Sequence, residues 1–369
     1  MFADFYKNKR VLITGVAGVK GPWLALELLA AGSQVVGMDC QPPALDSNFA
    51  ATNLGDQIEF VQGDVNDLPL MQSLLRDVDC VFHLAAISLV GEARRNPLET
   101  YRSNTLGTAT VLEAIRLSPA VQYAVFVTTD KVYKAKGGEV WCEGDPLFAT
   151  EPYPISKACA EMIIADYYRN YLRAAGKRIG IARAGNVLLG GDLYSSKRRP
   201  GAGHIHVDCF EALIEGRAPE IFTPKFTRPY TYGLDTLTGY MSLMARLDEE
   251  GNNGEAFNFG PHERYGVENG LLASKICSVW DSGLLWQSTT PRDEPFEKQS
   301  LNWDKARQRL GWQPAYTLYE GVQDLAHWYR AWGAQGQQLK PGSMATINAG
   351  LVQTHRTAAD KLGIWWATT

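Results

Sequence analysis

Residues 10–29 of the chain read RVLITGVAGVKGPWLALELL, and this stretch decides the fold. Its first five residues form a β-branched run that predicts a buried strand, and its last seven predict an amphipathic helix. Gly15, Gly18 and Gly21 stand between the two. In such a strand–turn–helix unit the first glycine permits a tight turn, the second lets the backbone approach a diphosphate, and the third lets helix and strand pack closely. The stretch therefore predicts a dinucleotide site with its diphosphate at the helix N-terminus.

Residues at the ends of the next predicted strands suggest which dinucleotide binds. Asp39 ends the second strand, where its carboxylate would accept hydrogen bonds from the adenosine ribose and repel a 2′-phosphate, so we expect NAD rather than NADP. The alternative for Asp39 is an ordinary turn residue. Asp64 and Val65 follow the third strand and would hold the adenine amino group. Ala85 and Ala86 follow the fourth and would line the cofactor, although small residues there are equally expected from packing.

Strands and helices alternate through the first half of the chain, which predicts an α/β fold with a doubly wound parallel Rossmann sheet. After about residue 190 the elements become shorter, which predicts a smaller C-terminal α+β substrate lobe. We expect three parts: an NAD-binding domain over residues 1–190, a substrate-binding lobe over residues 191–335 and a tail over residues 336–369. Trp365 and Trp366 in the tail would pack on the body or on a partner chain. His83 lies inside an apolar strand and is expected to be a core histidine with satisfied hydrogen bonds.

Composition and charge narrow the class of protein. Hydrophobic residues make up 45% and charged residues 21% of the 369, as in ordinary globular proteins. A net charge of −4 gives no bulk attraction to nucleic acid or to a membrane surface. The six cysteines form no Cys-x-x-Cys pair and no metal spacing, so we expect free thiols, a reducing compartment and no metal. The lack of a signal peptide and of a bilayer-spanning apolar run indicates a cytoplasmic protein without a membrane partner.

Reactive side chains stand at two further places. An apolar strand is followed by Thr129, Asp130 and Lys131, and Tyr153 and Lys157 stand one turn apart on a predicted helix. Polar groups at the carboxyl end of a parallel strand lie where ligands bind, so both sets would converge over one sheet edge. A neighbouring ammonium and the nicotinamide charge would lower the phenol pKa from about 10 and let Tyr153 act as a base. Lys157 would also hold the nicotinamide ribose. The alternative for Asp130 and Lys131 is a turn after a strand.

Together these segments resemble the extended short-chain dehydrogenase/reductase superfamily and, within it, the nucleotide-sugar 4,6-dehydratases, most of all those that act on CDP-glucose. The superfamily resemblance rests on residues 14–21, residues 83–86, Asn104, Thr129-Asp130 and Tyr153-x-x-x-Lys157. The closer resemblance rests on residues 19–26, 128–133, 182–192, 227–230, 257–261 and 310–314. The likeness runs from about residue 5 to residue 348.

The resemblance implies an NAD-dependent, redox-neutral dehydration of a nucleotide-diphosphate hexose to its 4-keto-6-deoxy form. Tyr153 would take the proton of the sugar 4-hydroxyl while C4 gives a hydride to NAD, and Thr129 would hydrogen-bond that hydroxyl. Asp130 would protonate the departing 6-hydroxyl. Lys131 stands where many relatives have the glutamate that removes the C5 proton. It would act as a base only if neutral, and would otherwise orient water or stabilise the enolate.

Further binding residues follow from the same resemblance. Asn104 would contact NAD, and Ser88 would lie at the substrate. Asn186 and Arg228 would hold the substrate diphosphate, the arginine as a forked donor. Arg183 would support the end of its strand.

Three places differ from the pattern of the CDP-glucose enzymes, and all three would lie near the sugar or the nucleotide. An arginine expected after the fourth strand is Gly91, with Arg94 and Arg95 nearby to compensate. Leu193 replaces a tryptophan, and Tyr232 replaces a histidine. A changed hexose, base or reaction outcome would follow from such changes.

Two other functions remain open at this point. A nucleotide-sugar 4-epimerase or decarboxylase would use the same tyrosine and lysine but lack the acid that expels the 6-hydroxyl. A non-catalytic NAD-binding protein would bind the dinucleotide without turnover. In either case the helices predicted at residues 96–117 and 153–175 would pair across a two-fold axis in a homodimer, as the superfamily resemblance implies.

Overall fold

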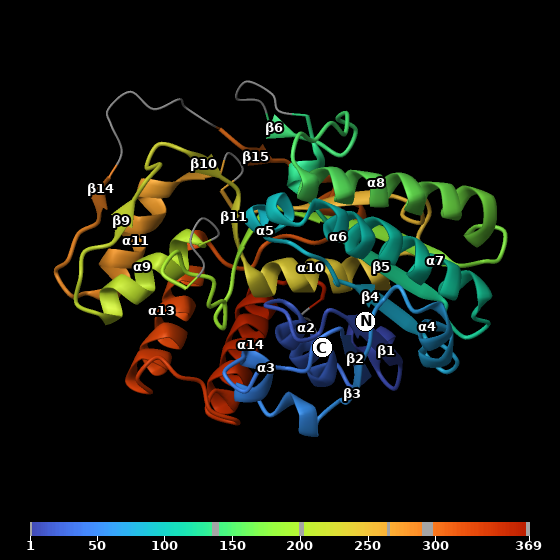
Figure 1. Cartoon of the computed structure of the whole chain (residues 1–369), viewed down its shortest axis with the longest axis horizontal. Helices are drawn as coiled ribbons and strands as arrows, with labels where there is room; N and C mark the ends of the chain where they lie inside the picture. The colour runs from blue at the N-terminus through green and yellow to red at the C-terminus, as the bar shows by residue number, and fades with distance from the viewer. Residues whose placement is uncertain (1, 135–139, 199–202, 264–265, 290–297, 367–369) are drawn as a thin grey trace.

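Seven parallel strands form the central sheet of the protein (Figure 1). The structure is a computed structural model, and it describes residues 2–134, 140–198, 203–263, 266–289 and 298–366. From one edge to the other the strands are β12 (Ala256–Phe259), β7 (Arg178–Ala184), β5 (Tyr123–Thr129), β4 (Cys80–His83), β1 (Arg10–Thr14), β2 (Gln34–Asp39) and β3 (Glu59–Gln62). The order reverses between β1 and β4, so a crevice opens there at the carboxyl ends of the strands. The predicted doubly wound parallel sheet is confirmed.

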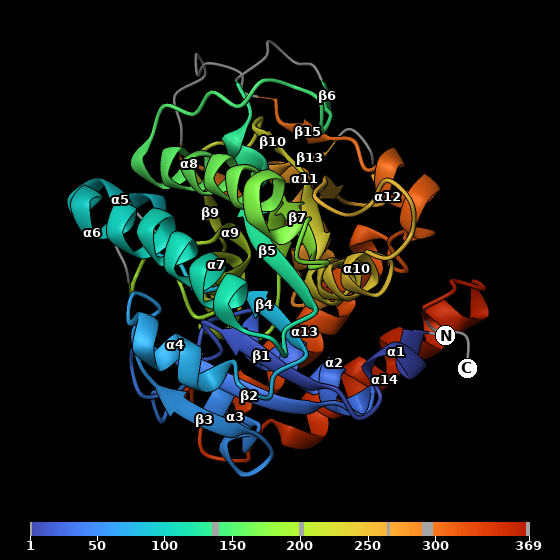
Figure 2. The same cartoon turned by 90° about the vertical axis from the view of Figure 1, so that its right-hand side faces the viewer.

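Helices cover both faces of this sheet (Figure 2). On one face lie α4 (Leu68–Leu74), α6 (Pro97–Tyr101), α7 (Gly107–Leu117) and α8 (Pro152–Tyr167), and on the other lie α2 (Gly21–Ala30) and α10 (Gly233–Ala245). Alternate residues of β1 enter the two cores, Leu12 on the α7 side and Val11 and Ile13 on the α2 side, because successive strand side chains point to opposite faces. Within the described residues, no helix has both the length and the apolar character to cross a bilayer.

A smaller lobe lies beside the carboxyl ends of the strands. Its helices are α9 (Ile205–Ile214), α11 (Asn269–Trp280) and α13 (Leu318–Ala334). Short strands pair around them, among them β8 (Asn186–Leu188) with β11 (Tyr230–Tyr232). The division at residue 190 does not separate this lobe from the sheet. Strand β12, expected in the smaller lobe, pairs with β7 and extends the main sheet, and α10 packs beneath it.

The segment expected as a tail contains a helix that packs on the body of the protein. Helix α14 (Ala345–Lys361) packs against α2 (Figure 2). The Nε atom of Arg356 donates to Oε2 of the buried Glu27 at 2.8 Å. The Nε2 atom of His355 lies 2.9 Å from Oδ1 of Asp235, and the ring of Trp366 stacks on that imidazole at 5.4 Å between centroids. The guanidinium of Arg246, which follows α10, lies 4.0 Å from the centre of the Trp365 ring, so the tryptophan pair packs on the body of the same chain.

Candidate functional site

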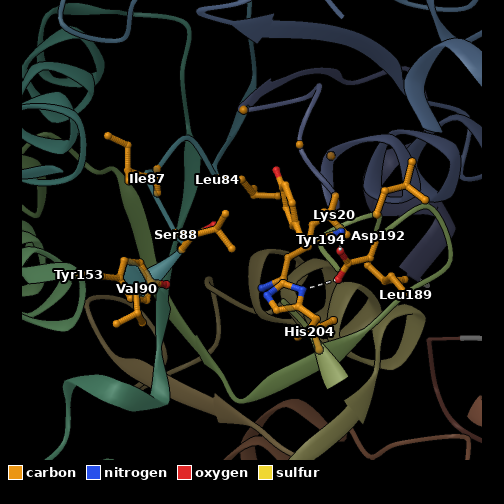
Figure 3. A pocket seen from close by; sticks show the side chains of 18 of the residues that line it. Lys20, Leu84, Ile87, Ser88, Val90, Tyr153, Leu189, Asp192, Tyr194 and His204 are labelled. Atoms are coloured by element: carbon orange, nitrogen blue, oxygen red, sulfur yellow. Dashed lines mark hydrogen bonds and ion pairs between the residues drawn. The ribbon is translucent and has the colours of Figure 1, made fainter. Parts of the chain in front are cut away.

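A cleft of about 1670 Å³ lies between the glycine turn and the smaller lobe. The predicted site residues that line it are Gly15, Gly18, Gly21, Asp39, Asp64, Val65, Ala85, Ala86, Ser88, Thr129, Lys131, Tyr153, Lys157 and Asn186. Figure 3 shows Ser88, Val90 and Tyr153 on one wall, with Tyr194 and His204 facing them from the other. The fold therefore brings most of the predicted residues to one cleft, whereas Asn104, Asp130 and Arg228 are not part of its lining.

The glycine turn has the shape that a dinucleotide diphosphate needs. Gly15 has a φ of +75°, and a Cβ there would lie 2.8 Å from the Cα of Ala85. A Cβ on Gly21 would lie 2.3 Å from the carbonyl oxygen of Val16. Both contacts are with backbone and cannot be relieved by a side-chain rotation. At Gly18 a Cβ would lie 3.3 Å from the Gly15 carbonyl oxygen, so glycine there keeps the turn open toward the cleft. The residues present fit the expected cofactor.

Asp39 and Asp64, the two acidic residues predicted to bind the adenosine part of the cofactor, have different hydrogen-bond partners. The Oδ2 atom of Asp39 accepts the backbone N–H of Ala17 at 3.0 Å, which fixes the carboxylate beside the glycine turn at the position expected for a ribose partner. Asp64 accepts hydrogen bonds from Asn66 through Oδ1 and pairs with Arg102 at 3.0 Å through Oδ2. Its role toward adenine stays a prediction.

Asp130 is a buried carboxyl at the end of β5. It begins a short 3-10 turn, η3 (Asp130–Val132), and is 1% exposed. The Thr129 hydroxyl donates to its Oδ1 at 3.1 Å, and in the part of the chain that the structure describes its Oδ2 has no hydrogen-bond partner. Burial raises the pKa of Asp130, although the charge of Lys131 and the Thr129 hydrogen bond act against it. A carboxyl in this state holds its proton to a higher pH than usual, as a proton donor must.

Tyr153 and Lys157 open helix α8 beside this carboxyl. Burial raises the pKa of Tyr153 to about 12, a hydrogen bond with Thr129 lowers it, and the charge of Asp130 raises it. The Nζ atom of Lys157 donates to the Val127 carbonyl at 2.9 Å. Burial and the charge of Lys20 lower the Lys157 pKa to about 8. In this arrangement burial sets the direction, because the lysine is bonded to the backbone; the lower Tyr153 pKa expected with the nicotinamide charge beside the phenol stays a prediction.

Lys20 is a cleft residue that the sequence reasoning treated only as part of a motif. Its Nζ donates to the hydroxyl of Tyr240 on α10 at 3.3 Å. Burial lowers its pKa to about 8, and the charge of Asp130 raises it. Its position in the sequence indicates this place, because Lys20 is a charged residue between the second and third glycines of the turn, and residues there line the cleft.

Three predicted residues act from behind the cleft. Asn104 is fully buried, and its amide bonds both the N–H and the carbonyl of Ile87, at 2.8 and 2.9 Å. Asn104 therefore fixes the backbone that follows β4 and is not part of the cleft lining. Arg183 forms a buried ion pair with Glu161, as expected for a supporting residue. Arg228 donates to the Thr227 carbonyl at 3.0 Å and is not part of the cleft lining, but its charge reaches Asp130 and acts to lower the pKa of that carboxyl.

Two expectations about the departures from the family pattern are corrected by the structure. Arg94 cannot compensate for Gly91 in the cleft, because its guanidinium makes two 2.7 Å hydrogen bonds to Glu151 outside the lining. Tyr232 is buried under the smaller lobe, where its hydroxyl donates to Asp324 at 2.9 Å. Its position is therefore structural and does not lie in the cleft wall. Leu193 does line the cleft.

Comparisons with known proteins agree with this geometry. The model of the GDP-mannose 4,6 dehydratase family matches residues 12–179. A CDP-glucose 4,6-dehydratase of Salmonella typhimurium is 31% identical over 341 residues, which cover 89% of this chain and 92% of the relative. A UDP-glucose 4-epimerase of Mycolicibacterium smegmatis is 28% identical, with 87% of this chain and 98% of the relative covered. The dTDP-glucose 4,6-dehydratase of Bacillus anthracis, solved in complex with NAD, has the same fold. It gives a TM-score of 0.72 at 22% identity and covers 87% of this chain and 96% of that one. The chain belongs to the nucleotide-sugar 4,6-dehydratase family of the extended short-chain dehydrogenase/reductase superfamily.

Proposed function

We propose that this protein removes water from a nucleoside-diphosphate hexose, with CDP-glucose as the first substrate to test, and yields the 4-keto-6-deoxy sugar nucleotide. The observation that supports this most is the state of Asp130. It is a buried carboxyl with a raised pKa, bonded to Thr129 and within electrostatic reach of Tyr153. Loss of a hydroxyl needs such an acid, whereas epimerisation at C4 does not. The CDP-glucose assignment is supported by the name of the 31% identical relative.

NAD fits the cleft in this proposal. The glycine turn and the N-terminus of α2 would hold its diphosphate, and Asp39 the adenosine ribose. Ala85 and Ala86 would line it, and Lys157 would reach the nicotinamide ribose after leaving the Val127 carbonyl. When bound, NAD accepts a hydride from C4 of the hexose and returns it to C6, so that none is consumed.

The chain's own residues move the protons. Tyr153 takes the proton of the 4-hydroxyl, and Thr129, which is hydrogen-bonded to this phenol, orients the same hydroxyl. The ketone at C4 acidifies the C5 proton, and Lys131 on the cleft wall is the side chain proposed to accept it or to stabilise the enolate. Asp130 gives its proton to the 6-hydroxyl, which leaves as water. When the hydride reaches C6, a proton returns to C5, and the proton that Tyr153 took from the 4-hydroxyl passes through solvent to Asp130, so the net change is the loss of one water.

The test is a panel of nucleotide sugars, CDP-glucose, UDP-glucose, dTDP-glucose and GDP-mannose, incubated with the purified protein. We expect one of them to lose one water, giving a product with the ultraviolet absorbance of a 4-ketone in alkali, while bound NAD stays constant. A product of unchanged mass would assign an epimerase, which the relative from Mycolicibacterium smegmatis makes the second candidate. Tight NAD binding without turnover of any sugar nucleotide would assign a non-catalytic protein.

We also propose a homodimer. Leu98 on α6, Leu106 after it and Met162 on α8 are 81, 55 and 62% exposed, and α6 and α8 pack against each other on one face of the sheet (Figure 2). Apolar side chains gathered on adjacent helices are suited to pairing with a second copy. Light scattering should give twice the chain mass, and replacement of Met162 by glutamate should reduce it to one chain mass.

A further inference from the structure

The loop after Asp39 forms the adenosine end of the cleft and is held in place by the last helix of the chain. Residues of this loop that line the cleft are Cys40, Gln41, Pro42, Ala44, Asp46 and Ser47. Residues 41–47 are all exposed or half-buried. The loop gains its first buried side chains at Asn48 and Phe49, which open the short helix α3 (Asn48–Ala51). Its position therefore depends on what these two side chains contact.

Asn48 ends a chain of buried hydrogen bonds that begins on α13. The indole Nε1 of Trp328 donates to Oδ1 of Asn348 at 3.0 Å, and Nδ2 of Asn348 donates to Oδ1 of Asn48 at 2.9 Å. Trp328 and Asn348 are fully buried, and Asn48 is 4% exposed. Together the two bonds form an amide relay from Trp328 through Asn348 to Asn48. The relay joins α13, α14 and the cleft wall across 300 residues of sequence.

Backbone bonds join the same two segments, so the relay belongs to a fixed contact. The N–H groups of Gly342 and Met344, just before α14, donate to the carbonyls of Ala50 and Ala51 at 3.0 and 2.8 Å. Figure 1 shows α3 beside the end of α14. The start of α14 is therefore part of the support of the cofactor loop.

The relay has one polarity. An indole nitrogen only donates, so Asn348 must turn its oxygen to Trp328 and its NH₂ group to Asn48. Asn48 must then turn its own oxygen to Asn348, which leaves its Nδ2 free. Within the residues that the structure describes, this Nδ2 has no hydrogen-bond partner. A buried amide donor without an acceptor is unfavourable, so a ligand oxygen at this place would be stabilising.

The surroundings of Asn48 indicate which ligand supplies that oxygen. Asn48 and Gly191, which follows β8, both line the cleft. Gly191 has a φ of +79°, and a Cβ there would lie 3.0 Å from the Asn48 Nδ2, so glycine keeps a side chain off this donor. Asn48 stands on the loop that starts at Asp39, the position expected for a ribose partner. The adenosine half of the cofactor is therefore the nearest source of an acceptor oxygen.

We propose that Asn48 binds an oxygen of the adenosine half of NAD, and that Asn348 of α14 is the residue that positions Asn48 for this contact. The ribose hydroxyls and the phosphate beside them both offer such an oxygen. The carboxyl-terminal helix thereby contributes to cofactor affinity without touching the cofactor. The proposal concerns binding of NAD and does not depend on the proposed reaction, so failure of a dehydration assay leaves it standing.

The experiment is a mutant cycle read by NAD affinity. The full chain, freed of nucleotide on charcoal, is titrated calorimetrically with NAD, AMP and adenosine. We expect Asn48→Ala and Asn348→Leu each to weaken NAD and AMP binding about five- to tenfold, the size of one neutral hydrogen bond. The double variant should bind NAD no more weakly than Asn48→Ala alone, because Asn348 acts through Asn48. Gln353→Leu, an exposed position of the same helix, is the matched control and should bind NAD as wild type does.

A further variant separates the polarity of the relay from its role in packing. Asn348→Asp keeps an acceptor for the indole but cannot donate to Asn48. The Asn48 amide should then turn its nitrogen to the carboxylate and present its oxygen where its nitrogen had been, so NAD affinity should fall as in Asn348→Leu. Circular dichroism checks that each variant is folded, and Asn48→Ala with Asn348→Asp completes the test where the leucine variant does not fold.

The fragments identify the oxygen, and several results would overturn the proposal. A loss seen with adenosine as well as AMP assigns the ribose, and a loss seen with AMP alone assigns the phosphate. Asn48→Ala with wild-type NAD affinity, or Asn348→Asp with wild-type affinity, would show that the free N–H binds nothing. Additive losses in the double variant would show that Asn348 acts by another route. Weaker NAD binding with unchanged AMP binding would place the contact outside the adenosine half.

Discussion

The buried ion pair between Arg183 and Glu161 lies behind the carboxyl end of β5, and its contacts predict how much its removal lowers the stability of the protein. Arg183 on β7 and Glu161 on α8 have side chains 6 and 3% exposed. The guanidinium Nε lies 2.9 and 3.1 Å from the two carboxylate oxygens, and the Thr128 hydroxyl donates to the same carboxylate at 2.6 Å. Glu161→Gln keeps the size of the side chain but leaves the arginine charge buried without its partner.

The expected cost is large for a single substitution. Removing one member of a buried pair costs about 3–5 kcal/mol, whereas replacing both by apolar residues of similar volume is often close to neutral. The unfolding entropy is about 2.1 cal/mol/K per residue, which for 369 residues gives about 0.8 kcal/mol/K. A loss of about 4 kcal/mol therefore lowers Tm by about 5 °C.

Differential scanning calorimetry of four proteins tests this. They are the wild type, Glu161→Gln, Arg183→Met, and the double variant Glu161→Leu with Arg183→Met. We expect both single variants to lose about 5 °C and the double variant to lie closer to the wild type than either. A Glu161→Gln protein that melts with the wild type, or a double variant less stable than both singles, would refute the reasoning. Because Thr128 leads directly into Thr129 and Asp130, the single variants should also lower kcat while bound NAD stays constant.

Four further results are expected. Asp130→Asn should slow loss of water by about 100-fold or more, with NAD content unchanged after gel filtration. The wild-type rate should fall as pH rises through the raised pKa of this carboxyl. A variant as fast as wild type would show that another group is the acid. Tyr153→Phe should stop oxidation at C4, seen as no product by mass and no transient absorbance of reduced NAD, with melting unchanged. Gly21→Ala should lose NAD binding or fold poorly, because its Cβ would meet the Val16 carbonyl oxygen at 2.3 Å; normal NAD affinity would contradict this fit. Burial lowers the pKa of His83 to about 3 and that of His206 to about 4. The unfolded chain therefore binds more protons than the folded chain as pH falls below about 6.5. Urea unfolding midpoints should drop between about pH 6.5 and 4, and they should drop less steeply in His206→Gln.

The sheet and the cofactor end of the cleft could be predicted because their signals are local. Three glycines within seven residues fix a turn whose neighbours, Val16 and Ala85, lie within backbone contact. The core assignment of His83 is confirmed, since its two ring nitrogens lie 2.8 and 3.1 Å from the hydroxyls of Thr14 and Thr108. Such assignments depend on period and chemistry within a short stretch, which a sequence displays directly.

The rest depends on which distant segments meet. The pKa of Tyr153 is set by the burial that surrounding elements impose, and spacing on one helix does not reveal it. Lys20 meets Tyr240 across 220 residues, and Asp192 meets His204 across a polar stretch that has no periodicity. Helix α14 is hard to predict because polar Asn348 and His355 interrupt its buried face of Leu351, Val352 and Ala359.

The docking of α14 on α2 has a consequence for how the protein is made. Glu27 is synthesised 329 residues before Arg356, yet its side chain is buried with its carboxylate on that arginine. Domains fold in order during synthesis, so α2 gains the Arg356 partner of Glu27 only after α14 has been made. A chain truncated before α14 would therefore leave Glu27 on α2 without its arginine. The truncation would destabilise α2, and proteases would cleave near α2, far from the truncated end.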